Sequence, residues 1–64
     1  MTKKNYIVLA ASLNRTKSML KSKGLDDNTV MTIMDTILPE LCNVLRRDNP
    51  RFDADKFYAA VYKD

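Results

Sequence analysis

The chain has no histidine, one cysteine and one glycine among its 64 residues. Histidine is the side chain that most often acts as a general base, and the usual zinc site needs several cysteine or histidine ligands. The lone Cys42 forms no disulfide within the chain, and Gly24 alone is too little glycine for a phosphate-binding loop. We therefore expect a protein that is not an enzyme and that carries no metal or other cofactor.

Cys42 and the paired aspartates have ordinary structural interpretations. Cys42 lies beside an apolar helical stripe with no base available, which favours a small buried hydrophobe over a reactive thiol. Asp26 and Asp27, and likewise Asp53 and Asp55, stand at expected helix starts, where aspartate caps the first turn. Capping alone accounts for both pairs.

Long apolar runs are also missing. The run from Tyr6 to Ala11 is only six residues long and is followed by Ser12, Asn14 and Arg15. It is too short for the apolar region of a signal peptide or for a membrane span. A lone cysteine also suits a reducing compartment. We expect a cytoplasmic protein that does not enter a membrane.

The charge balance is only mildly basic, with eleven Lys and Arg against eight Asp and Glu, a net +3. A dedicated nucleic-acid binder usually has a stronger basic footprint. In a helix-turn-helix, the last helix would lead into the groove with Asp53 and Asp55, which is electrostatically unfavourable. A small helical DNA-binding regulator is therefore the disfavoured alternative.

The length allows one domain, residues 1–64. A chain this small buries roughly 60% of the surface that it exposes when unfolded, so its stability is marginal. Small domains make up the deficit with disulfides, metals or self-association, and the first two are not available here. Self-association is the supplement that we expect.

The apolar residues recur at helical spacing, so the predicted fold class is all-α, a compact domain of three or four helices. The first helix is expected over about residues 4–21, ending at Gly24 in a left-handed cap. The polar segment 14–18 favours helix weakly, so an earlier end near Leu13 is the alternative.

The second helix is expected over 27–48, capped by Asp26, Asp27 or Asn28. Pro39 falls inside it and is expected to kink it or to split it in two, which leaves the helix count at three or four. The positions expected to face the core are Val30, Ile33 or Met34, Ile37, Leu41, and Leu45 or Val44.

A sharp corner precedes the third helix, which is expected over 53–62. Asn49 and Pro50 end the preceding helix, because proline cannot continue it. Asp53 is a good N-cap. Phe52 and Phe57 have the spacing of a hydrophobic staple, which sets the angle at which the chain enters a helix.

The candidate partner contacts are Met31, Met34, Arg51, Tyr58 and Tyr62. Met31 and Met34 give a soft apolar surface on the middle helix, although Met34 also suits the core. The segment 30–34 is apolar on more than one side, so the helix needs more than one neighbour. We expect one neighbour to be a second copy of the chain, in a homodimer or higher oligomer. Arg51 has no structural duty that the sequence reveals.

The segment 49–60, Asn-Pro-Arg-Phe-Asp-Ala-Asp-Lys-Phe-Tyr-Ala-Ala, together with Tyr6-Ile-Val-Leu-Ala-Ala-Ser-Leu-Asn14, resembles small phage and prophage proteins with an N-P-R-F-D-x-x-K/R-F-x-x-A-C pattern. This chain departs from them at Val61, where they have cysteine, and at Pro39. The resemblance implies a phage accessory protein and transfers no functional residue. We expect such a protein to work in the host cytoplasm by binding host or phage proteins, in host takeover or counter-defence.

Overall fold

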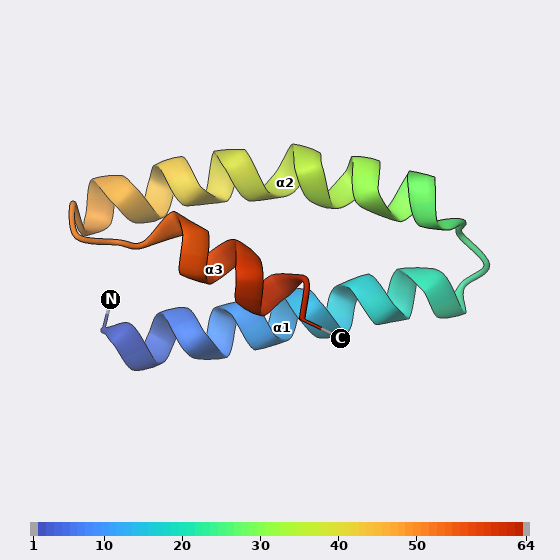
Figure 1. Ribbon diagram of the computed structural model, residues 1–64, viewed down its shortest axis with the longest axis horizontal. Coiled ribbons are helices and arrows are strands. Elements are labelled where there is room, and N and C mark those ends of the chain that lie inside the picture. Colours follow the sequence, from blue (N-terminus) through green and yellow to red (C-terminus); the bar gives the residue numbers. More distant parts are fainter. Residues whose placement is uncertain (1, 64) are drawn as a thin grey trace.

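The computed structural model describes residues 2–63, and within that range it contains three helices and no strand. They are α1 (Lys3–Ser22), α2 (Asp27–Asp48) and α3 (Ala54–Val61). As Figure 1 shows, α1 and α2 lie side by side in opposite directions, and α3 crosses from the end of α2 toward the middle of α1. The predicted all-α fold class is confirmed, and the three helix positions agree with the expected ranges to within one residue.

The helix α1 runs through the polar segment without a break. The Thr2 hydroxyl caps its start by accepting the N–H of Asn5 at 3.3 Å. Further along, the hydroxyls of Thr16 and Ser22 donate to main-chain carbonyls one turn earlier, so these polar residues find partners within the helix. The alternative end near Leu13 is therefore wrong.

Gly24 makes the turn that ends α1, with a φ of 94°. Its N–H donates to the Lys21 carbonyl at 3.0 Å, and the Leu25 N–H donates to the Leu20 carbonyl at 3.4 Å. This pair of bonds is a Schellman motif, which satisfies carbonyls that the helix leaves without partners. The expected left-handed cap is confirmed.

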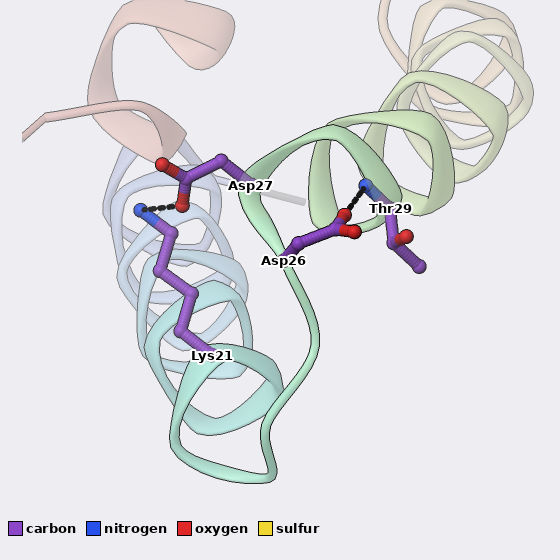
Figure 2. Close-up of polar contacts among 4 residues, drawn as sticks. All are labelled: Lys21, Asp26, Asp27 and Thr29. Atoms are coloured by element: carbon purple, nitrogen blue, oxygen red, sulfur yellow. Dashed lines mark hydrogen bonds and ion pairs between the residues drawn. The ribbon is translucent and has the colours of Figure 1, made fainter.

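Asp26 then starts α2, because its carboxylate accepts the Thr29 N–H at 2.7 Å (Figure 2). Of the three residues considered for this cap, the fold uses the first. The neighbouring Asp27 points back toward α1, where its carboxylate lies 3.5 Å from the Lys21 ammonium. The turn between the two long helices is thus held by local contacts from both sides.

The helix α2 continues unbroken through Pro39, so the alternative of two separate helices is not what this fold contains. Proline inside a helix costs about 3 kcal/mol, because it removes a main-chain hydrogen bond and crowds the preceding turn. Pro39 and Asp35, whose carbonyl loses its partner, both lie on the exposed side of α2. Met34 and Leu38, which directly precede these two residues, are fully buried, and each contributes roughly 1.5–3 kcal/mol. Packing on the buried side therefore outweighs the cost.

The core is a single cluster contributed by all three helices and by the corner before α3. Its buried members are Ala10, Val30, Met34, Leu38, Cys42, Leu45, Phe52, Phe57 and Val61. Within the core, the Phe52 ring meets the Tyr6 ring at 5.0 Å and the Phe57 ring at 5.4 Å, both edge to face. The Phe52–Phe57 contact is the predicted hydrophobic staple, and Asp53 caps α3 by accepting the Lys56 N–H at 3.1 Å.

The corner that leads into α3 is held by Asn49. Its main chain is extended, as the residue before a proline prefers. The Asn49 side chain accepts the Arg51 N–H at 3.0 Å, and its carbonyl accepts the Phe52 N–H at 2.9 Å. The corner is therefore a rigid turn that places Phe52 against α1.

Candidate interaction surfaces

The predicted contact residues do not gather on one surface. Met34 is fully buried in the core, which agrees with the core position that the sequence also offered and leaves it no exposed surface for a partner. Met31 is 44% exposed and lines a hollow of about 330 Å³ that it shares with Tyr62. Tyr58 on α3 and Tyr62, the residue that follows α3, are half-buried, and Arg51 is exposed at the corner before α3.

Tyr62 is held by three neighbours. Its hydroxyl donates to a carboxylate oxygen of Asp35 at 2.7 Å, and its ring stacks on Tyr58 with centroids 6.4 Å apart. The Lys17 ammonium lies 5.6 Å from the centre of the Tyr62 ring. Burial, and then the bond to Asp35, raise the pKa of Tyr62 to about 12. These contacts fix α3 to both long helices, so most of the Tyr62 side chain is used inside the fold.

Cys42 is buried in the core and faces Tyr58. Burial raises the pKa of the thiol, which keeps it protonated at neutral pH. The position agrees with the interpretation of Cys42 as a small hydrophobe. Burial likewise raises the pKa of the Tyr58 hydroxyl.

One apolar surface appears where the sequence predicted core. Ile37 is 42% exposed, so its assignment to the core is wrong. Of the alternatives Leu45 and Val44, Leu45 is the buried one, and Val44 is 49% exposed. Ile37 is two residues from Asp35, and Val44 is two residues from Cys42. Two residues turn a helix by about 200°, so these side chains point away from α3.

The helix α1 also carries partly buried apolar residues. Its leucines pack against the core, and on α2 the partly buried Ile33 lies one turn before Ile37. We call this surface, on the side of α1 and α2 that α3 leaves open, the α1–α2 face. Its members are Leu9, Leu13, Leu20, Ile33, Ile37 and Val44. The sequence predicts this face only in part. The excess of apolar residues on the middle helix indicates a second neighbour, but it does not indicate on which side of the helix that neighbour packs.

A second surface is a groove of about 490 Å³ between the first half of α1 and the corner before α3. We call it the corner groove. Its apolar residues are Tyr6, Ile7, Ala10, Phe52, Phe57 and Ala60, and its polar rim is Lys3, Asn49, Arg51, Asp53 and Lys56. Arg51 thus lies on the rim of a hollow, which the sequence did not reveal.

Within residues 2–63, no three cysteine, aspartate or glutamate side chains are grouped so that they would hold a metal ion. None of the helices in that range is both long and apolar enough to cross a bilayer. No protein-family model matches the chain, and comparisons with curated proteins and with solved structures find no match either. The two surfaces are therefore the features of the molecule that bear on its function.

Proposed function

We propose that this chain is a small, non-enzymatic, phage-type accessory protein that acts through protein–protein contacts and self-associates through the α1–α2 face. The observation that supports this most directly is the exposure of Ile37 and Val44 on α2, together with the half-buried leucines of α1. A contiguous apolar surface on a small domain marks an interaction site. The same proposal includes that the protein acts in the host cytoplasm, in host takeover or counter-defence.

A second copy suits this face by charge as well as by its apolar character. Glu40 and Arg47 are both exposed and stand seven residues apart on the outer edge of the face, beside Ile37 and Val44. Two helical turns separate them, so they share one side of α2. A two-fold interface brings residue i of one copy to residue j of the other and repeats the pair in reverse. Opposite charges at the two positions would form Glu40–Arg47 pairs twice across one axis.

Sedimentation equilibrium at micromolar concentration tests the proposal. The wild-type chain is expected to show a mass above the 7.4 kDa of one copy, and Ile37→Glu is expected to shift it to the monomer. Met19→Glu is the matched control, because Met19 is 58% exposed and lies outside the α1–α2 face. Circular dichroism should show the same helix content for both variants. A clean monomer of the wild-type chain would overturn self-association.

A charge exchange tests the two-fold pairing. Glu40→Arg and Arg47→Glu should each weaken association, because each places like charges across the axis. The double variant should restore it, since the pairs return with their signs reversed. Association that is equally strong in both single variants and in the double variant would contradict this arrangement.

DNA binding is the rival function, and the fold gives it little support. The short α3 begins with Asp53 as its cap and has Asp55 in its first turn, so its leading end is acidic. Polarisation measurements with labelled duplex DNA separate the two functions. Binding with a steep salt dependence would favour the regulator over the interaction protein.

A further inference from the structure

We propose that the corner groove binds an acidic, amphipathic segment of a partner protein, with its apolar side chains in the groove and its carboxylates over the rim. This inference rests on the proposed function, since it assumes a protein that acts through protein contacts. It concerns a different surface, because the groove lies between α1 and the corner before α3 and not on the α1–α2 face.

The floor of the groove is apolar and preformed. Phe52 and Phe57 are only 8% and 4% exposed, and their edge-to-face contact, with Tyr6 packed against Phe52, fixes the rings. Ile7, by contrast, is 61% exposed at the side of the groove. A fixed apolar floor with an exposed aliphatic wall accepts apolar side chains without first having to order itself.

The rim adds positive charge from three separate parts of the chain. Lys3 comes from the first turn of α1, Arg51 from the corner and Lys56 from α3, and all three are exposed. The one carboxylate of the rim, Asp53, is engaged as the cap of α3. An apolar hollow bordered by three cations is complementary to a segment with an apolar stripe flanked by Asp or Glu. A helix that docks its apolar side in a groove meets both requirements.

Nucleic acid fits the groove less well. Sequence-tolerant binding of single strands relies on exposed aromatic faces on which bases stack. The two phenylalanine rings at the floor are buried edge to face and offer no such platform. The phosphodiester backbone would also leave the apolar floor uncovered.

Selection from a random display library of 16-residue peptides tests this chemistry, with the wild-type protein as bait. The bound peptides are expected to be enriched in Asp and Glu beside Leu, Ile, Phe or Met at helical spacing. Ile7→Glu should reduce binding of a selected peptide by at least about tenfold, because it places a charge against the apolar stripe. Val8→Glu is the matched control: Val8 is 59% exposed, follows Ile7 directly and does not line the groove.

Charge reversal at the rim tests whether the cationic side chains of the groove contribute to binding of the acidic segment. Arg51→Glu and Lys56→Glu should each weaken binding several-fold, and added salt should weaken binding to the wild-type protein. Enrichment of basic or uncharged peptides, or equal loss in Ile7→Glu and Val8→Glu, would overturn the inference. So would competition by a single-stranded oligonucleotide at equal concentration.

Sedimentation measurements distinguish a failure of the self-association proposal from a failure of the groove proposal. Ile7→Glu should retain the mass of the wild-type chain, because Ile7 lies outside the α1–α2 face. If the wild-type chain is monomeric yet binds acidic peptides in the groove, self-association fails alone. If it self-associates and the library yields no acidic apolar peptide, the groove inference fails alone.

Discussion

The phenolic hydroxyl of Tyr62 donates a 2.7 Å hydrogen bond to the carboxylate of Asp35, 27 residues earlier in the chain. The bond joins the end of α3 to the middle of α2. The Tyr62 ring also lies under the Lys17 ammonium of α1. One side chain therefore contacts both long helices, and this arrangement has a testable dependence on pH.

The stability that Tyr62 contributes should disappear in strong alkali. Its pKa is about 12 in the folded protein against an ordinary value of 10. Because the folded value is raised, the contribution is fully present below pH 10 and is lost as the pH rises toward 12. The difference in free energy of unfolding between the wild-type chain and Tyr62→Phe should shrink across that interval. Urea unfolding at a series of pH values measures it, and a constant difference would contradict the role of the hydroxyl.

Asn14 should contribute more to stability than an average surface asparagine. Its amide nitrogen donates to the carbonyl of Val61 at 2.8 Å and also to that of Lys63, which ties the end of α3 to α1. We expect Asn14→Ala to lower the free energy of unfolding by about 1–3 kcal/mol. Asn43→Ala is the control, because Asn43 has only a long 3.5 Å contact with Arg46 and its loss should change stability by less than about 0.5 kcal/mol. Equal effects in the two variants would argue against the tether.

The two aspartates at the start of α2 should differ sharply in how much they contribute to stability. Asp26→Ala removes the cap on Thr29 and should lower the melting temperature by roughly 5 °C. Asp27→Ala removes only an exposed ion pair with Lys21 and should have little effect. Melting curves followed by circular dichroism compare the two directly, and the reverse order would show that the ion pair, not the cap, holds this turn.

The Asp26 cap also predicts a dependence on acid. Hydrogen bonding by Thr29, through its side chain and its N–H, holds the pKa of Asp26 below its ordinary value of 3.8. A depressed pKa means that the cap stabilises the fold above pH 3.8 and is lost as the pH falls through the lower folded value. The difference in melting temperature between the wild-type chain and Asp26→Ala should therefore shrink at acidic pH. A difference that does not narrow at all as the pH falls below 3.8 would argue against the ionised carboxylate as the capping group.

Replacing Pro39 should make the protein more stable. Its ring sits on the exposed side of α2, so the buried packing does not depend on it. Pro39→Ala restores a main-chain hydrogen bond and removes the clash with the preceding turn, although it frees the unfolded chain. We expect a net gain of about 1–2 kcal/mol in the free energy of unfolding, measured by urea titration. A loss of stability would mean that packing of the helix depends on the proline ring.

The features that could be predicted from the sequence are those whose partners lie within a few residues. Gly24 ends α1 because only glycine adopts its φ at no cost, and Asp53 caps the helix that begins beside it. The contact between Phe52 and Phe57 spans five residues and is dictated by the start of a helix. Such short-range chemistry depends little on the rest of the fold.

The residues that form the α1–α2 face and the corner groove could not be predicted, because they depend on how each helix is rotated toward its neighbours. The middle helix is apolar over a wide arc, so its own pattern fits several orientations toward the core. In the folded chain Met34 is buried and Ile37 and Val44 are exposed, the reverse of one expected arrangement. Arg51, predicted from the sequence as a candidate partner contact without a structural role, lines the corner groove, which forms only when the corner packs on α1. Local hydrogen bonding therefore specifies where each helix starts and stops, whereas contacts between residues far apart in the chain, such as Asn14 with Val61, select the side that remains for partners.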